Sequence, residues 1–116
     1  MRSPLTQLFR GQVYTATIPE MDGVEKLFVV ISNNDRNRRL RTSLVLKLTS
    51  REGPTYKSIV AIPASETRTT GMTGWVLCDG IYQLILDEGD VNSHETTFSY
   101  DFMKQIDDGL RFALSL

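Results

Sequence analysis

Residues 33–41, NNDRNRRLR, place four arginines in a short polar segment between two apolar runs. These arginines are Arg36, Arg38, Arg39 and Arg41. Clustered guanidinium groups create a positive potential that raises the local concentration of phosphate groups. We interpret the segment as an extended basic loop that contacts an anionic partner. The alternative is a solvated loop whose charge serves solubility.

The remaining charge is distributed unevenly, although the formal net charge is only −1. Residues 87–108 contain seven of the fourteen acidic residues, and Lys104 is the only base among them. Such asymmetry predicts one cationic and one anionic surface on the same domain.

The residue types exclude several common kinds of chemistry. No cluster of histidine, cysteine or carboxylate has the spacing of a metal site, and the glycines form neither a phosphate-binding loop nor a dinucleotide-binding fingerprint. His94, the one histidine, lies in a polar stretch and is expected to be an exposed loop residue. The single cysteine, Cys78, is expected to be a core thiol. An enzyme with this sequence is therefore predicted to work without a metal ion or organic cofactor.

RNA is a natural substrate for such an enzyme because it carries its own nucleophile, the 2′-hydroxyl beside each phosphodiester. The enzyme needs only to align the 2′-oxygen, the phosphorus and the leaving 5′-oxygen, and to stabilise charge on the phosphorane. Lys47 and Thr49 lie on one face of an expected strand and offer a cation and a hydroxyl. Together with the basic segment they suit this reaction.

The expected fold is mainly β, with about five mostly antiparallel strands and a C-terminal helix. Strands are predicted over residues 11–18, 27–32, 43–50, 58–62 and 74–86 from β-branched, aromatic and alternating apolar patterns. Gly80 is expected to form a bulge or bend within the last of them. The 116 residues suffice for one domain, placed at 10–116, after an N-terminal tail over residues 1–9.

The C-terminal helix is predicted from a change of period. Phe102, Ile106 and Leu110 recur every four residues, as on one face of a helix. Ser99 is a suitable N-cap. Gly109 weakens the helix by about 1 kcal/mol relative to alanine, so we expect a neighbouring element to pack closely against it.

Three segments in order, RGQVYTATI, KLFVVISNNDRNRR and SLVLKLTS, resemble the MazF/PemK family of toxin endoribonucleases. The family pattern is an opening R-G-[DEQ]-[IV]-[YW], a basic residue that leads into an apolar strand ending S-N-[DN]-x-x-N, and a strand ending L-T-[ST]. A later segment, TGWVLCDGIYQL, looks like the family's strand with an acidic residue. The resemblance covers about residues 10–115.

This resemblance implies a small SH3-like antiparallel barrel with a C-terminal α-helix, usually assembled as a homodimer. It implies sequence-selective, metal-independent cleavage of single-stranded RNA such as mRNA, which leaves 2′,3′-cyclic phosphate and 5′-hydroxyl ends. The implied partners are this RNA and a cognate antitoxin, whose acidic, partly apolar, disordered segment neutralises the toxin. No cofactor is implied.

The resemblance also suggests individual site residues. Lys26 stands at the family's catalytic arginine, Thr49 at its catalytic threonine, and Asp79 at an acidic position near the scissile phosphate. Lysine keeps the positive charge of arginine but lacks its bidentate fork. The residues expected to bind RNA are Asn33, Arg36, Arg38, Arg39, Arg41 and Lys47. The loop PEMDGVE lacks the G-S-E-Q-G-G run of many members, so the RNA sequence preference is expected to differ.

Two alternative functions fit the same fold. CcdB-type toxins poison DNA gyrase without cutting RNA, but they use a C-terminal tail with a tryptophan, whereas this chain ends RFALSL. A catalytically silent module that binds nucleic acid or antitoxin is the second alternative, and Lys26 in place of the usual arginine supports it.

The sequence also predicts a cytoplasmic location. The longest apolar run, residues 27–31, is too short to span a membrane. Residues 1–9 lack the apolar region of a secretory signal.

Overall fold

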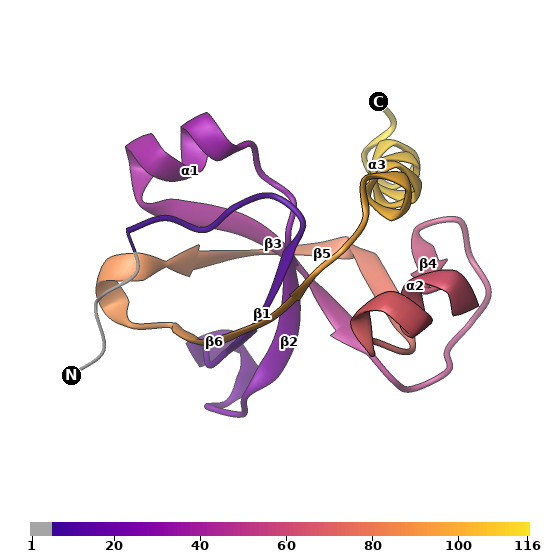
Figure 1. Cartoon of the computed structure of the whole chain (residues 1–116), viewed down its shortest axis with the longest axis horizontal. Coiled ribbons are helices and arrows are strands. Elements are labelled where there is room, and N and C mark those ends of the chain that lie inside the picture. Colours follow the sequence, from indigo (N-terminus) through magenta and orange to yellow (C-terminus); the bar gives the residue numbers. More distant parts are fainter. Residues whose placement is uncertain (1–5) are drawn as a thin grey trace.

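A six-stranded antiparallel sheet forms the centre of the computed structural model, which describes residues 6–116 (Figure 1). The elements in chain order are β1 (Gln12–Ala16), β2 (Lys26–Val30), α1 (Asn34–Leu40), β3 (Thr42–Thr49), β4 (Ile59–Ala61), α2 (Ala64–Thr70), β5 (Trp75–Ile85), β6 (Val91–Thr97) and α3 (Tyr100–Leu114). Residues 1–5, part of the tail predicted over residues 1–9, lie outside the described residues.

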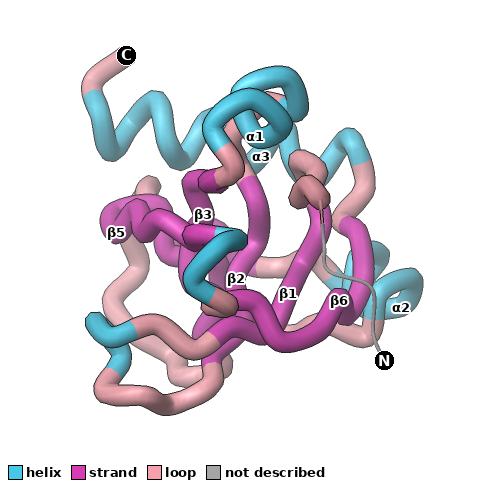
Figure 2. The backbone as a smooth tube through the Cα atoms, turned by 90° about the vertical axis from the view of Figure 1, so that its left-hand side faces the viewer, coloured by secondary structure: helices cyan, strands magenta, loops and turns pink. Residues whose placement is uncertain are grey.

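The strand order is β4-β5-β3-β2-β1-β6, and every neighbouring pair is antiparallel. Figure 2 shows β3, β2, β1 and β6 side by side in this order. The outer strands β4 and β6 do not pair with each other, so the sheet is not closed. The expected antiparallel β fold with a C-terminal helix is therefore confirmed, with an open sheet in place of a closed barrel.

Both faces of the sheet are buried near its centre, because successive strand residues point to opposite sides. On β3, Leu46 and Leu48 pack in one apolar cluster, which α3 covers with Phe102 and Ile106. A second cluster on the opposite face includes Val45, Tyr14 and Phe28. It also includes Leu8, which is completely buried, so the core begins before the predicted boundary at Arg10.

The C-terminal helix begins as predicted. The Ser99 side chain accepts a hydrogen bond from the Phe102 N–H at 3.1 Å, which is an N-cap contact. The prediction did not include α2, whose buried Glu66 accepts hydrogen bonds from the Ser99 N–H at 2.7 Å and the Ser99 Oγ at 2.6 Å. Glu66 therefore fastens the start of α3 to α2. The segment ASETRTT is short and mostly polar, and so has no apolar period that would indicate a helix.

The expectation that His94 lies in a loop is wrong, because His94 lies in the edge strand β6. Its residues, VNSHETT, are mostly polar because an edge strand exposes much of its surface. His94 is exposed, as expected, but it pairs with Tyr14 of β1 and their rings lie 5.1 Å apart.

The irregularity predicted at Gly80 is confirmed. Leu46 of β3 pairs with Ile81, and Leu48 pairs with Val76, so β5 carries extra residues, Gly80 among them, between these two pairs. Cys78 lies between the same two pairs and is buried, which confirms the expected core thiol. Burial raises the pKa of its thiol to about 11, and the nearby carboxylates of Asp79 and Asp107 add to this effect.

Gly109 provides the first testable prediction, the stability of a Gly109→Ala variant. A Cβ at this position would lie 2.7 Å from Val60 Cγ2 and 2.9 Å from Cys78 Sγ. Overpacking typically costs about 1–3 kcal/mol, which exceeds the gain of about 1 kcal/mol in helix propensity because Val60 is β-branched and cannot easily turn away. We expect a lower Tm in thermal unfolding. Gly53→Ala is the control, because no atom lies within 4 Å of a Cβ there.

Candidate active site

A groove opens where β2 and β3 separate at one end of the sheet. The ladder between these strands pairs Val30 with Val45, Val29 with Leu46, and Phe28 with Lys47. The same register would next place Leu27 opposite Leu48 and Lys26 opposite Thr49, but the pairing has already ended there. The strands diverge at these residues and leave a groove of about 440 Å³.

The groove has apolar and polar walls. Its lining residues are Thr15, Glu25, Lys26, Leu27, Lys47, Leu48, Thr49, Ser50, Gly71, Met72 and Thr73. The last three directly follow α2 in the chain. The structure thus brings together Lys26, Lys47 and Thr49, which the sequence analysis selected for cleavage and RNA binding.

The two lysines of the groove are not neutralised within the protein. Neither Lys26 nor Lys47 forms an ion pair with any residue in the range 6–116. Both side chains are partly buried, where charges are screened less by solvent and salt than on an open surface. An anionic group that enters the groove would therefore meet two unpaired cations.

Thr49 is the last residue of β3, and a backbone contact positions its hydroxyl. The Arg51 N–H donates a hydrogen bond to Thr49 Oγ1 at 3.1 Å. The oxygen thus accepts from the chain, while its own hydrogen can be donated to a ligand. This arrangement suits an oxygen atom of a phosphate group.

Asp79, the third candidate for catalysis, is not among the residues that line the groove. It lies on β5 with an exposed side chain, and Ser58 Oγ donates a hydrogen bond to its Oδ2 at 2.5 Å. The structure therefore shows a structural contact for Asp79 and does not place it with Lys26 and Thr49.

The interpretation of residues 33–41 as an extended loop is wrong, because residues 34–40 form α1. Asn33 is the N-cap, and its Oδ1 accepts a hydrogen bond from the Arg36 N–H at 2.8 Å. Asp35 in the first turn and two arginines in the last turn complement the helix dipole. The charged residues of this segment, which favoured a basic loop, are therefore also placed as expected in a short helix.

The arginines of this segment have partners within the chain. Arg38 and Arg39 contact Asp35 at 2.7 and 3.0 Å, and these hydrogen bonds lower the pKa of the Asp35 carboxyl. Arg41 contacts Asp87 at 2.7 Å and lowers the pKa of that carboxyl in the same way. The guanidinium of Arg36 donates to the Thr42 carbonyl at 3.1 Å.

These arginines also lie far from the groove. They precede or surround the start of β3 at Thr42, whereas the groove lies at its other end, at Thr49. At the usual rise of a strand the two ends are about 23 Å apart. Figure 1 agrees, because α1 lies at the opposite end of the molecule from α2, which adjoins the groove.

The S-N-N-x-x-N signature has a structural role in the fold. Asn37 is buried, and its Nδ2 donates to the carbonyls of Leu8 at 3.2 Å and Ser32 at 3.1 Å. Ser32 Oγ donates to Asn37 Oδ1 and accepts from the Leu44 N–H. These contacts fix α1 against the end of the sheet where the chain passes from β2 to β3.

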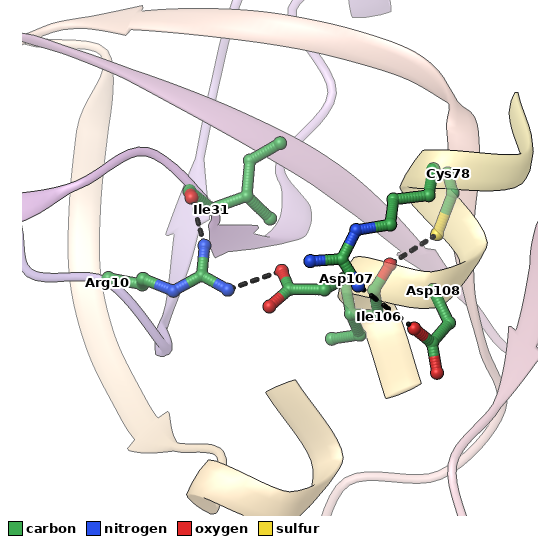
Figure 3. Close-up of polar contacts among 7 residues, drawn as sticks. Arg10, Ile31, Cys78, Ile106, Asp107 and Asp108 are labelled. Atoms are coloured by element: carbon green, nitrogen blue, oxygen red, sulfur yellow. Dashed lines mark hydrogen bonds and ion pairs between the residues drawn. The ribbon is translucent and has the colours of Figure 1, made fainter. Parts of the chain in front are cut away.

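Arg10 connects three further parts of the fold (Figure 3). Its guanidinium donates to the Ile31 carbonyl at the end of β2 and forms an ion pair of 2.5 Å with Asp107 of α3. Its backbone N–H donates to Asn34 Oδ1 at 2.7 Å. Arg10 therefore stabilises the packing of α3 and α1 on the sheet and lies outside the groove.

Two general findings complete the description of residues 6–116. No group of three or more histidine, cysteine, aspartate or glutamate side chains is arranged to hold a metal ion in this range. None of the helices described there has the length and apolar character needed to cross a membrane.

The fold and the groove define a small β protein with two lysines in a groove at one end of its sheet. The chain belongs to the PemK-like, MazF-like toxins of type II toxin–antitoxin systems, because the model of that family matches residues 9–114. The resemblance seen in the sequence is thus confirmed. No curated protein matches the chain.

Solved structures of similar proteins support the same family. An endoribonuclease in complex with its cognate antitoxin, from a mycobacterial species, is 28% identical with a TM-score of 0.80, over 94% of this chain and 96% of that one. A second mycobacterial endoribonuclease is 27% identical with a TM-score of 0.79, over 99% of this chain and 97% of that one. A MazE–MazF structure from Deinococcus radiodurans, at 19% identity and a TM-score of 0.74, covers 95% of this chain and 97% of that one, and supports the fold.

Proposed function

We propose that this protein is an endoribonuclease toxin that cuts single-stranded RNA without a metal ion. The observation that carries the proposal is the groove at the end of the β2–β3 ladder. Lys26 and Lys47, which form no ion pair with residues 6–116, line this groove together with Thr49. The two mycobacterial structures at 27 and 28% identity are endoribonucleases, which supports this reaction class.

In the proposed reaction the 2′-oxygen of one nucleotide attacks the adjacent phosphorus. The bond between the phosphorus and the 5′-oxygen then breaks, which leaves a 2′,3′-cyclic phosphate and a free 5′-hydroxyl. Lys26 and Thr49 both line the groove, and we propose that the scissile phosphate binds between them. A cation and a hydroxyl donor placed there stabilise the extra charge of the phosphorane more than that of the ground-state phosphodiester.

Lys47 extends the cationic surface along β3 and would bind a neighbouring phosphate. The apolar side chains of Leu27, Leu48 and Met72 give the groove surfaces on which a base or an apolar peptide side chain could pack. The same groove therefore suits both RNA and the acidic, partly apolar segment of a cognate antitoxin, which would neutralise the toxin by covering it. We also propose a homodimer that acts on mRNA in the cytoplasm.

Incubation of the purified protein with a long single-stranded RNA in EDTA tests the proposal. The expected result is a limited set of cuts, each with a 2′,3′-cyclic phosphate on one side and a 5′-hydroxyl on the other. Intact RNA together with inhibition of DNA gyrase would support the CcdB-like alternative. Binding of RNA without any cut would support a silent binding module.

The arginines around α1 are proposed to bind RNA phosphates beyond the groove. Arg38 and Arg39 have side chains 63 and 70% exposed, and their ion pairs with Asp35 are weak enough to exchange for phosphate. We expect each phosphate contact removed by Arg38→Ala or Arg39→Ala to reduce the logarithmic salt slope of RNA affinity by about 0.7.

The slope is measured with single-stranded RNA in a Thr49→Ala background, so that no substrate is consumed. Arg111→Ala is the matched control, because Arg111 is 64% exposed and forms a similar ion pair with Asp108 on α3. If the slopes of both α1 variants equal that of the control, α1 is a solvated helix whose charge serves solubility or the antitoxin.

A further inference from the structure

Among the described residues that line the groove, Glu25 is the one with a carboxylate side chain. We propose that it is the general base of the cleavage reaction and accepts the proton of the attacking 2′-hydroxyl. This inference rests on the proposed endoribonuclease function and adds the group that this function lacks, because lysine ammonium groups and a threonine hydroxyl cannot serve as the base near neutral pH.

The position of Glu25 supports this role. It directly precedes β2 and shares the groove with Lys26, at the end where the β2–β3 ladder has opened. Asp79, the carboxylate that the sequence analysis selected, does not line the groove and accepts a hydrogen bond from Ser58. Glu25 therefore lines the same groove as Lys26 and Thr49, and the proposal is that its carboxylate reaches the ribose of a nucleotide bound there.

A partner on another strand orients the Glu25 carboxylate. Asn92 Nδ2, on β6, donates to Glu25 Oε2 at 2.6 Å and to Thr17 Oγ1 at 2.9 Å. This amide occupies one carboxylate oxygen, and no other described residue donates to Oε1. One oxygen is therefore held by the protein while the other can accept a proton. Asn92 is a positioning residue in this scheme.

The proposed cleavage step uses only the RNA, the Glu25 carboxylate and the Lys26 ammonium as reactants. Glu25 Oε1 accepts the 2′-hydroxyl proton, and the electron pair of that O–H bond forms the new bond from the 2′-oxygen to phosphorus. The bond from phosphorus to the 5′-oxygen breaks, and the 5′-oxygen takes a proton from the Lys26 ammonium. Proton exchange with solvent then returns Glu25 to the carboxylate and Lys26 to the ammonium.

Glu25→Gln is the direct test, because glutamine keeps an oxygen that can accept from Asn92 but cannot take the proton. We expect single-turnover cleavage to slow by about 10²- to 10⁴-fold, the usual contribution of general acid–base catalysis. RNA affinity should not fall, since the variant removes a negative charge from the groove. Glu88→Gln, an exposed carboxylate outside the groove, is the control and should cleave at the wild-type rate.

A second substrate distinguishes the general base, proposed to be Glu25, from the general acid, proposed to be Lys26. When sulfur replaces the 5′-oxygen at the cut site, the leaving thiolate departs without a proton. The deficit of Lys26→Ala should then shrink, while that of Glu25→Gln should persist. Asn92→Ala should lower kcat without weakening RNA binding, and should add little to Glu25→Gln because both changes act on one group.

Three outcomes would be decisive. If wild-type protein cuts RNA and Glu25→Gln keeps more than a tenth of its rate, the assignment of Glu25 is overturned while the proposed function stands. Rescue of Glu25→Gln by the sulfur substrate would likewise overturn it. If the wild-type protein itself leaves RNA intact, the proposed function fails before Glu25 is tested.

Discussion

An RNA whose scissile nucleotide carries hydrogen in place of the 2′-hydroxyl is expected to remain uncut at that position. The reaction proposed for the Lys26–Thr49 groove uses the 2′-oxygen as its nucleophile, so the substitution removes a reactant rather than a contact. Cleavage at the modified site should fall below detection, because no other nucleophile is aligned with the phosphorus. Gel analysis of end-labelled RNA with a single 2′-deoxy nucleotide measures this.

The same RNA supplies its own control, because cleavage at unmodified sites should continue at the usual rate. Binding of the modified RNA should also be nearly unchanged, since the phosphates that the lysines contact are intact. Equal cutting of the modified and unmodified sites would contradict attack by the 2′-hydroxyl and would indicate a water-dependent hydrolysis.

Removal of either central side chain of the groove is expected to have the next largest effect. Thr49→Ala and Lys26→Ala should each lower the rate of cleavage by about 10²-fold or more, the usual loss when one transition-state donor is removed. Both residues lie where the β2–β3 ladder has ended, so neither substitution removes a pair of that ladder. Single-turnover kinetics with saturating enzyme measures the chemical step separately from binding.

Matched variants outside the groove test whether the losses are specific. Thr55 lies on an exposed loop and Lys104 on the exposed face of α3, and neither lines the groove. Thr55→Ala and Lys104→Ala should cleave as the wild type does. A folded Lys26→Ala, Thr49→Ala double variant with normal cleavage would show that the site lies elsewhere.

Much of the fold could be predicted from local patterns. The strand residues around Val13, Val29 and Leu46 form apolar or alternating runs, and burial on the sheet requires such runs. The helix at the C-terminus shows its cap at Ser99 and its apolar period at Phe102 and Ile106. These signals are strong because each element buries apolar residues against the core. The buried residues recur along the sequence with the period of a strand or a helix.

The elements that were missed bury few apolar residues. In β6 the sequence VNSHETT pairs at the edge of the sheet and has the polar composition of a loop. In α2 the one buried residue is Glu66, whose hydrogen bonds to Ser99 replace apolar packing. The arginines of α1 suggest a ligand and favour an extended loop, although Asn33 is a standard N-cap residue.

The family, the positions of the main strands along the chain, and Lys26 and Thr49 as candidate site residues could all be predicted from the order of the residues. The other groups that line the groove became clear from the folded chain, because they depend on where the β2–β3 ladder ends. In the structure the α1 arginines and the groove lie at opposite ends of β3. The charges in the sequence do not reveal this separation. The fold also brings Asn92 to Glu25 across 67 positions of the chain, because β6 pairs with β1 and β1 pairs with β2. Local patterns report burial, whereas contacts between distant residues follow from strand order and register.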